Sequence, residues 1–382
     1  MPDTTAHCLR VAVVTGSRAE YGLLRPVMRA IASRPELSLM VVAAGSHLVL
    51  PGETFRDVKA DFPIAGIVPM QVAGRTGRDE DVQSVGRGVG RFGRVFGEIT
   101  PDLVVVLGDR IEAFAAATAA SLGGLPLAHI HGGDRAEGIA DEAMRHAITK
   151  LAHIHFPATP ESAERLIRMG EDAARVHMVG SSALDELGEM PSLSDEAWAE
   201  LGEPQAVFLM HPSRGDAPAE RALAEGVLAE LRGLRVLAMQ PNLDAGREGI
   251  MEAITQEQSR RPGGFVARGH LTRPLFVGVL KRLVATGGVL VGNSSAALIE
   301  AAALGLPAID IGPRQSGRER FSNVLSIAGP AELPEALATA RSQHGKAVAH
   351  GYGDGRAGER IAGVLARVDV RAPGFSRKRC AY

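Results

Sequence analysis

The chain has 382 residues, of which 45% are hydrophobic and 23% charged, and its formal net charge is −2. A globular chain of this length is too long for one ordinary core, so we expect two domains of roughly 150–200 residues each. The balanced charge argues against nucleic acid or an anionic membrane surface as a partner. With only Cys8 and Cys380, a disulfide framework and a cysteine-based zinc site are excluded.

No targeting or membrane segment is predicted. The stretch MPDTTAHCLR has no apolar core, and VAVVTG after it is too short to be one. No stretch approaches the ~20 apolar residues that a bilayer-spanning helix needs. We therefore expect a cytoplasmic protein.

Short β-branched runs alternate with Ala/Leu/Arg-rich helical patterns, which predicts parallel sheets that are buried on both faces. The expected strands are 10–16, 37–45, 102–109, 125–133, 153–159, 175–180, 206–212, 235–241, 263–269, 287–293 and 306–312. Helical segments between them supply right-handed crossovers. The predicted fold class is therefore α/β, with two Rossmann-like, doubly wound domains.

An acidic segment at about 182–205 interrupts this alternation and is expected to connect the domains. We place the first domain at 1–185 and the second at 186–382, with the C-terminal helix packing back on the first. Ligands of doubly wound sheets bind beyond the carboxyl ends of the strands. Two such domains facing a cleft would bring their strand-end residues together.

Two strand ends carry arginines that suit an anion. Gly16 and Ser17 form a turn through which backbone N–H groups can approach a phosphate, and Arg18 adds a bidentate donor. The sequence has neither GxGxxG nor GxxxxGK[ST] here, so no dinucleotide fingerprint and no P-loop is predicted. A second cluster follows a later strand and suits a pyrophosphate, although a solvated loop has the same pattern; it comprises Arg314, Arg318 and Arg320.

A third strand end is predicted to open directly into a helix. Asn293, Ser294 and Ser295 stand at its start, where N–H groups and the helix dipole favour an anion. Glu300, five residues after Ser295, is placed to accept ribose hydroxyls. Helix capping alone explains one such polar residue, but three of them and a carboxylate favour a nucleoside diphosphate.

The segment 129–150, HIHGGDRAEGIADEAMRHAITK, raises the question of a metal. His129 and His131 are two apart on a predicted strand and are expected to share one face. With Asp134 they resemble the beginning of a metal-hydrolase site. Further ligands at suitable spacing are lacking except Asp109 and His211, so we expect no metal.

An acid/base site explains the same segment better, because a closing cleft can separate the pKa values of neighbouring carboxyl groups. Asp141 and Glu142 also start a helix, where the dipole favours acids, so one of them can serve the helix alone. The candidate carboxylates are Asp109, Asp134, Glu137, Asp141 and Glu142.

Five motifs together resemble the hydrolysing UDP-N-acetylglucosamine 2-epimerases of the bacterial sialic and legionaminic acid pathways. They occur in the family's order and span roughly residues 10 to 330. The motifs are TGSRAEYG, VVLGDRIEAF, HIHGGDRAEGIADEAMRHAITKLAHIHF, GNSSAALIE and IGPRQSGRERFSNVL.

The resemblance implies a glycosyltransferase-B-like fold with acid/base residues in the first domain and nucleotide binding in the second. It also implies elimination of UDP across C1 and C2, followed by addition of water, which releases a free N-acetylmannosamine-type sugar. No cofactor is implied. The expected partner is a nucleotide sugar, UDP-linked with GDP as the exception, and the expected assembly is a homodimer or a homotetramer.

The resemblance assigns roles to residues of the matching motifs. Asp109 and Asp141 fall at acid/base positions, and His211 corresponds to a histidine near the diphosphate. Glu300 matches the ribose contact. The implied phosphate contacts are Arg18, Ser294 and Ser295 beside Asn293, with Arg318 as a further diphosphate contact.

Two positions depart from the family's pattern. His131 stands where mammalian members have Glu, and Asp134 stands where the bacterial subgroup usually has Glu. Asp is one methylene shorter, which changes its reach to a sugar carbon. Because imidazole titrates near neutrality, His131 is a candidate for the second acid or base.

Three rival functions keep some of these motifs. A glycosyltransferase of the same plan would keep the diphosphate residues but would need an acceptor and no carboxylate cluster. A non-hydrolysing epimerase would return the sugar to UDP. A nucleotide-sugar sensor would bind without turnover. The sequence leaves open whether the sugar is N-acetylglucosamine or a 2,4-diacetamido analogue.

Overall fold

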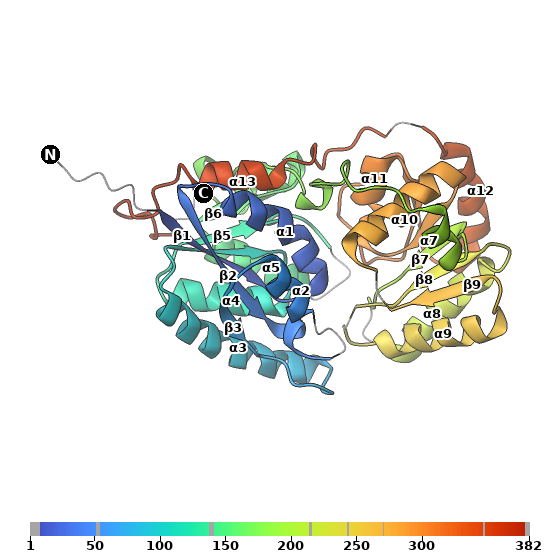
Figure 1. Cartoon of the computed structure of the whole chain (residues 1–382), viewed down its shortest axis with the longest axis horizontal. Coiled ribbons are helices and arrows are strands. Elements are labelled where there is room, and N and C mark those ends of the chain that lie inside the picture. The colour runs from blue at the N-terminus through green and yellow to red at the C-terminus, as the bar shows by residue number, and fades with distance from the viewer. Residues whose placement is uncertain are drawn as a thin grey trace. The chain divides into compact units, whose positions relative to one another are not determined.

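The computed structural model describes residues 8–50, 54–136, 141–213, 216–242, 244–269, 271–346 and 348–378. They form two α/β units, each built on a six-stranded parallel sheet with helices on its faces (Figure 1). This confirms the predicted class of two Rossmann-like domains. The first unit comprises the described residues of Met1–Asp134, Ala140–Asp185 and Gly351–Tyr382, and the second those of Arg135–Ile139 and Glu186–His350.

The sheet of the first unit has the order β3-β2-β1-β4-β5-β6, so its direction of winding reverses between β1 and β4. Its strands are β1 (Leu9–Thr15), β2 (Leu37–Ala44), β3 (Ile64–Val68), β4 (Leu103–Leu107), β5 (Leu127–Ile130) and β6 (Ile154–Phe156). Its helices are α1 (Arg18–Ala32), α2 (Phe55–Asp61), α3 (Arg78–Ile99), α4 (Ile111–Leu122), α5 (Asp141–Leu151), α6 (Pro160–Arg168) and α13 (Ala357–Leu365), with 3₁₀ turns η1 (Gly45–Leu48), η2 (Ala173–Arg175) and η3 (Ser182–Leu184).

Both faces of this sheet are buried, which explains the continuous apolar runs of the sequence. Val11 and Val13 of β1 pack with α1 and α13 on one face. The alternate residues Ala12 and Val14 pack with α3 and α4 on the other. The chain thus returns to the first unit at α13, where Asp185 accepts hydrogen bonds from the first turn of that helix.

The sheet of the second unit has the order β12-β11-β10-β7-β8-β9 and reverses between β10 and β7. Its strands are β7 (Ala206–Leu209), β8 (Val236–Met239), β9 (Phe265–Arg268), β10 (Val289–Gly292), β11 (Ala308–Ile311) and β12 (Val324–Ile327). Its helices are α7 (Asp195–Glu200), α8 (Ala217–Glu230), α9 (Arg247–Arg260), α10 (Arg273–Thr286), α11 (Glu300–Leu304) and α12 (Leu333–Gln343), with 3₁₀ turns η4 (Ser295–Ala297) and η5 (Pro330–Glu332).

One predicted strand is absent from the structure, and two strands of the structure were not predicted. The predicted strand at 175–180 is wrong, because this segment makes only the single bridge His155–Val176. Pro157 directly follows β6 and has no N–H with which to continue a ladder. Strands β3 and β12 were not predicted, because both lie at sheet edges and are only partly buried. Their sequences therefore lack the long apolar runs of central strands.

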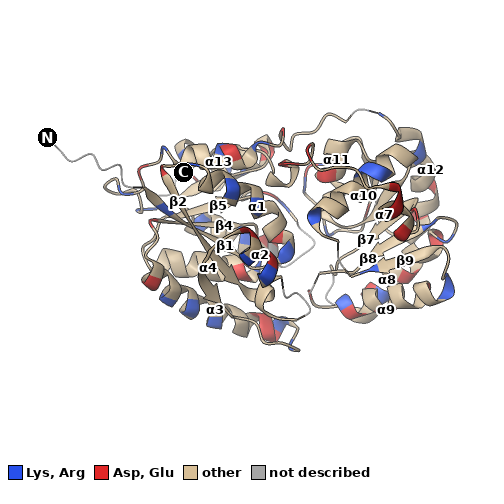
Figure 2. Ribbon diagram, viewed as in Figure 1, with Lys and Arg blue, Asp and Glu red and all other residues tan. Residues whose placement is uncertain are grey.

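Charged residues of both signs are spread along helices α3 and α9 (Figure 2). Within the described residues, no helix is both long and apolar enough to cross a bilayer. The segment predicted as a connection contains α7, whose N-cap Ser194 accepts a hydrogen bond from the Ala197 N–H at 3.2 Å. Trp198 of this helix is buried.

Candidate active site

Arg145 of α5 links two strand-end carboxylates in the first unit. It forms an ion pair with Asp109, which follows β4, and its Nη1 lies 3.8 Å from Oδ2 of Asp134, which follows β5. The side chains of Arg145 and Asp134 are 4% and 2% exposed, and that of Asp109 is 15% exposed. Ser162 Oγ donates to Asp134 Oδ1 at 2.9 Å. Two carboxylates therefore share one cation in nearly dry surroundings, where electrostatic interactions are stronger than in water.

His129 supports this cluster through the backbone. Its Nε2 lies 2.7 Å from the Gly108 carbonyl, next to Asp109, and its Nδ1 lies 3.2 Å from Thr149 Oγ1. Burial lowers the pKa of His129 to about 3, so the ring is neutral. Because a carbonyl only accepts, Nε2 carries the proton. His129 therefore fixes the loop that presents Asp109.

His131 does not share a strand face with His129, contrary to our expectation. Strand β5 ends at Ile130, and His131 has a left-handed backbone with φ of +61°. The two-residue alternation of side chains holds only within a strand, so it stops before His131. The His131 side chain is buried, and its N–H donates to the Phe156 carbonyl at 2.9 Å. Among the described residues, no group of three or more His, Cys, Asp or Glu side chains is arranged to hold a metal ion.

The turn after β1 presents Arg18 as the first residue of α1. Ser17 caps this helix by accepting from the Glu20 N–H at 3.4 Å. Arg18 is half-buried, and burial lowers the pKa of its guanidinium although the negative charge of Asp57 opposes this. The switch point between β1 and β4 thus carries Arg18 on one strand end and Asp109 on the other.

In the second unit, His211 and Asn293 are joined across the corresponding switch point between β7 and β10. The His211 N–H donates to Asn293 Oδ1 at 2.7 Å, and Asn293 Nδ2 donates to the His211 carbonyl at 2.9 Å. Nδ1 of His211 accepts from the Asn242 N–H at 3.1 Å, so a neutral ring carries its proton on Nε2. The approach requires Gly292, whose φ is +152° and where a Cβ would lie 1.9 Å from the Leu209 carbonyl oxygen.

The segment after β10 is not one continuous helix, so that expectation was wrong. Ser294 caps the short 3₁₀ turn η4, its Oγ accepting from the Ala296 N–H at 3.4 Å, and Ser295 is the first residue of that turn. The α-helix begins only at Glu300. Glu300 is buried, and its Oε1 lies 3.3 Å from Nη1 of Arg273 at the start of α10. A long helix dipole is therefore absent at Ser295.

The arginine cluster after β11 is tied to the same network. Arg314 Nη1 and Gln315 Nε2 donate to the Asn293 carbonyl at 3.2 and 2.9 Å. Arg318 Nη1 donates to Gln315 Oε1 at 3.1 Å. Arg320 pairs with Asp310 at 2.9 Å, and burial raises the pKa of Asp310 despite that arginine. Arg320 also donates to the Gln315 carbonyl at 3.0 Å, so the predicted cluster forms one connected network that reaches from Asn293 to Asp310.

The structure thus brings together Asp109 with Asp134, and His211 with Asn293. It joins Arg318 to the second pair through Gln315, whereas Glu300 pairs separately with Arg273. Glu137 and the side chain of Asp141 lie outside the described residues. No role was predicted for five polar residues, because a polar side chain that the fold buries looks like an ordinary surface residue in one sequence. They are Arg145, Ser162, Asn242, Arg273 and Gln315.

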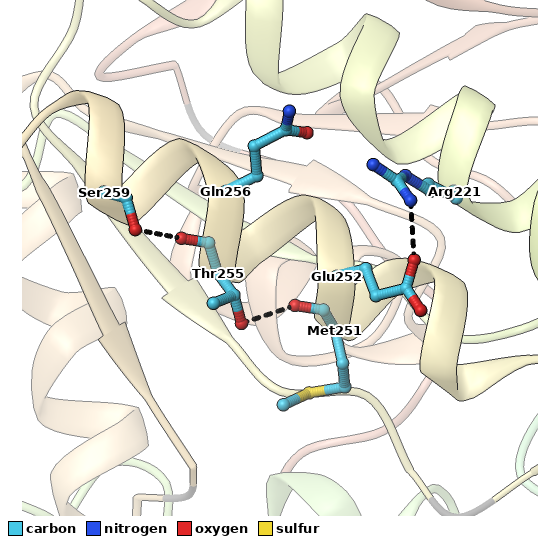
Figure 3. A pocket seen from close by; sticks show the side chains of 6 residues that line it. All are labelled: Arg221, Met251, Glu252, Thr255, Gln256 and Ser259. Carbon is cyan, nitrogen blue, oxygen red and sulfur yellow. Dashed lines mark hydrogen bonds and ion pairs between the residues drawn. The ribbon is translucent and has the colours of Figure 1, made fainter.

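A hollow on the second unit lies away from these strand ends. It is formed by α8 and α9, with Arg221, Glu252 and Thr255 in its wall (Figure 3). Arg221 pairs with Glu252 at 2.7 Å, and Thr255 Oγ1 donates to a carbonyl of its own helix at 2.9 Å. These polar groups are satisfied within the helical layer, so we do not assign the hollow to the site.

Comparison with known proteins identifies the family. A family model described as UDP-N-acetylglucosamine 2-epimerase matches residues 29–366. The chain belongs to the UDP-N-acetylglucosamine 2-epimerase family. It is 34% identical over 377 residues to UDP-N,N'-diacetylbacillosamine 2-epimerase (hydrolyzing) of Legionella pneumophila, covering 95% of this chain and 97% of that relative. It is 32% identical to UDP-N-acetylglucosamine 2-epimerase of Neisseria meningitidis, covering 83% of each chain.

Solved structures of the epimerase family share the fold. The crystal structure of UDP-GlcNAc 2-epimerase from Neisseria meningitidis bound to UDP-GlcNAc superposes with a TM-score of 0.77, 16% identity and coverage of 94% of this chain and 100% of that one. This likeness confirms the fold class of two Rossmann-like domains.

Proposed function

We propose that this epimerase-family enzyme is a hydrolysing 2-epimerase. It converts a UDP-N-acetylglucosamine-type sugar, either UDP-GlcNAc or UDP-2,4-diacetamido-trideoxyglucose, to UDP and a free N-acetylmannosamine-type sugar for nonulosonic acid biosynthesis. The name of the Legionella relative, which specifies a hydrolysing reaction on a diacetamido sugar, supports the choice. The observation that carries the proposal is the pair of carboxylates, Asp109 and Asp134, held by the buried Arg145.

Inversion at C2 explains why two acid/base groups are needed. The proton leaves one face of the sugar and a proton must return to the other face, which one fixed carboxylate cannot serve alone. We assign Asp109 to one face. Asp134 or its neighbour His131 is assigned to the other, and Asp141 remains a third candidate.

The first step is an elimination. A carboxylate takes the C2 proton, the C1–O bond to the diphosphate breaks, and the C2–H electron pair forms a C1=C2 double bond. Because C2–H is a very weak acid, the developing charge on the leaving diphosphate must be stabilised by fixed donors. In the second step, the hydroxyl of a water adds to C1 and a proton adds to the opposite face of C2. The balance is nucleotide sugar plus water to free sugar plus UDP.

The polar network of the second unit suits the leaving diphosphate. A neutral His211 presents Nε2–H as a donor, and Asn293 holds its backbone in place. We assign Ser294 and Ser295 to the phosphates with Arg318 and Arg18, and Glu300 to the ribose. These are donors in fixed positions, which need no reorganisation when charge develops.

The test is an NMR time course in deuterated water with UDP-GlcNAc and its 2,4-diacetamido analogue offered separately. We expect UDP and a free manno-configured sugar that carries deuterium at C2, and the faster donor identifies the substrate. A UDP-linked epimer would instead indicate a non-hydrolysing epimerase. If both donors stay intact while UDP binds, the enzyme is a transferase awaiting an acceptor, uses a GDP sugar, or is a sensor, and the proposal is overturned.

A further inference from the structure

Two buried carboxylates of the first unit have no part in the chemistry above. Glu20 on α1 is 4% exposed, and Glu112 at the start of α4 is fully buried. The Gly16 N–H donates to Glu20 Oε2 at 2.9 Å, and the Ser46 N–H donates to Glu112 Oε1 at 3.4 Å. Each carboxylate is therefore bound to a backbone group of a strand-end loop, one after β1 and one after β2.

Glu112 also fills the space that two glycines leave open. A Cβ added at Gly16 would lie 2.4 Å from Glu112 Cβ, and one added at Gly45 would lie 2.3 Å from Glu112 Cγ. The two glycine loops are joined directly as well, because Ser46 Oγ donates to the Gly16 carbonyl at 2.8 Å. The side chain of Glu112 thus lies between the loops that follow β1 and β2, while its own backbone belongs to the first turn of α4, directly after the loop that follows β4.

Two of these three strand ends lead to residues of the proposed reaction. Arg18 follows Gly16 by two positions, and Asp109 precedes Glu112 by three. Arg110 provides a cation beside Glu112, with its Nε 3.6 Å from Glu112 Oε2. That oxygen has no hydrogen-bond donor among the residues the structure describes. A movement of Glu112 would therefore shift the backbone on both sides of the switch point between β1 and β4.

Glu20 is expected to keep its proton at neutral pH. Burial, and then the negative charge of Glu112, raise the pKa of Glu20 to about 8, against smaller opposing effects of the Gly16 N–H and Arg110. On the neighbouring elements, burial and the charge of Arg18 lower the pKa of His47 to about 4, so that ring adds no charge. Two ionised carboxylates in such dry surroundings would repel each other strongly.

We propose that Glu20 and Glu112 act as a buried carboxylate pair that positions the strand ends carrying Arg18 and Asp109. The proposal rests on the proposed function, which gives those two residues their roles. Both glutamates are positioning residues, because they act on the loops and are not placed against the sugar. While the pair keeps its proton, the three loops stay together. Loss of the Glu20 proton places two negative charges next to the Gly16 loop, and their repulsion separates the loops.

The experiment compares wild type with Glu20→Gln and Glu112→Gln, and with Glu257→Gln as a matched control. Glu257 is a buried glutamate of the second unit that pairs with Arg232 on the helical layer. Two quantities are measured between pH 6 and 10: kcat and KM in the epimerase assay, and the titration of the Glu20 carboxyl carbon by NMR. Gln is chosen because it has the shape and hydrogen-bonding groups of a neutral Glu.

We expect wild-type activity to fall above pH 8 by up to about tenfold per pH unit, as for loss of one essential proton. Glu20→Gln should remain active at pH 7 and lose this alkaline decline. Glu112→Gln should lower the pKa measured at Glu20, because it removes the negative charge that raises it. Glu257→Gln should leave the profile and the titration unchanged. A purely structural role of Glu20 would affect stability without moving the pH profile.

The proposal is overturned if Glu20→Gln keeps the wild-type alkaline decline, or if Glu20 in the wild type titrates near 4.5, the ordinary pKa of Glu. If Glu20→Gln fails to fold, the proposal is still tested by the pKa of Glu20 measured in wild type and by its change in Glu112→Gln. Absence of turnover on either sugar at any pH would count against the proposed function alone. The pair is then tested by the same titration and by UDP affinity, which should weaken above pH 8 in wild type but not in Glu20→Gln.

Discussion

The switch points of the two sheets have the same topology and different chemistry. In the first unit, the strand ends carry ionisable side chains, Asp109 and Asp134, around the buried Arg145. In the second unit, His211 and Asn293 are joined by neutral hydrogen bonds, and Arg314 donates to the Asn293 carbonyl. Topology thus selects where a site forms, whereas the residues at the strand ends select what it does.

The difference follows from what each half of the proposed reaction requires. Proton transfer needs groups that gain and lose charge, and a shared buried cation orients two of them. Binding a diphosphate needs donors that keep one position and one protonation state. The proton-transfer residues of the first unit are expected to be sensitive to substitutions that change their charge. The diphosphate-binding residues of the second unit are expected to be sensitive to substitutions that remove or displace a hydrogen-bond donor.

Asp109→Asn should have the largest effect, because it removes a proton acceptor while keeping the shape. We expect kcat to fall by roughly 10²- to 10⁴-fold with little change in UDP affinity. The measurement is kcat in the NMR assay beside UDP binding by calorimetry. Asp102→Asn is the control, since Asp102 lies at the opposite end of β4 and bonds Arg10 and Arg371. Full activity of Asp109→Asn would refute our assignment.

Arg145→Met should come second. It leaves Asp134 and Asp109 without their shared cation, and breaking a buried pair in this way costs about 3–5 kcal/mol. We expect a matching decrease in the free energy of unfolding by urea and a loss of turnover. Arg145→Lys should recover part of the stability, but a single ammonium group should not contact Asp109 and Asp134 in the way that the guanidinium does. Unchanged stability in Arg145→Met would show that the carboxylates do not depend on this cation.

Asn293→Ala tests the second unit. It removes the two hydrogen bonds between Asn293 and His211, and each such hydrogen bond contributes about 0.5–1.5 kcal/mol. We expect UDP affinity to fall by roughly 10- to 100-fold while kcat at saturation changes much less. Calorimetry with UDP and a saturation curve separate the two effects. A loss confined to kcat would place Asn293 in the chemical step.

The pH dependence of stability tests the dry surroundings of the first unit. Folded Glu20 keeps its proton up to a pKa of about 8, whereas an unfolded glutamate releases it near 4.5. The folded state therefore holds more protons between these values, and the free energy of unfolding falls as pH rises, by at most about 1.4 kcal/mol per pH unit. Glu20→Gln should remove this decline. The prediction is contradicted if the free energy of unfolding in urea changes by the same amount from pH 5 to 8 in wild type and in Glu20→Gln.

Ser294→Ala should have the smallest effect, because Ser294 caps only a 3₁₀ turn. Loss of a cap costs about 0.5–2 kcal/mol, and we expect the low end of this range. UDP affinity should weaken by roughly three- to tenfold with kcat unchanged. Calorimetry measures the change. An effect larger than that of Asn293→Ala would make Ser294 the principal phosphate contact.

The predictions from sequence succeeded where a pattern has one physical cause. Central strands such as β1 and β4 are continuous apolar runs because both faces of the sheets are buried. Edge strands β3 and β12 were missed because only the last residue of each is buried. The role of Arg145 could not be predicted, because its burial depends on two loops that are distant in the sequence.

By itself, the sequence determined the two-domain α/β class, the strand-end positions of Asp109, Asp134, His211 and Asn293, and the family resemblance. These follow from local periodicity and from motifs that lie within single strand-to-loop junctions. Only the tertiary structure decided that Arg145 joins Asp109 to Asp134, that His131 leaves the strand, and that Glu112 is wedged between Gly16 and Gly45. These relations depend on which loops meet at a sheet edge, and that is set by the order of the strands rather than by any one segment.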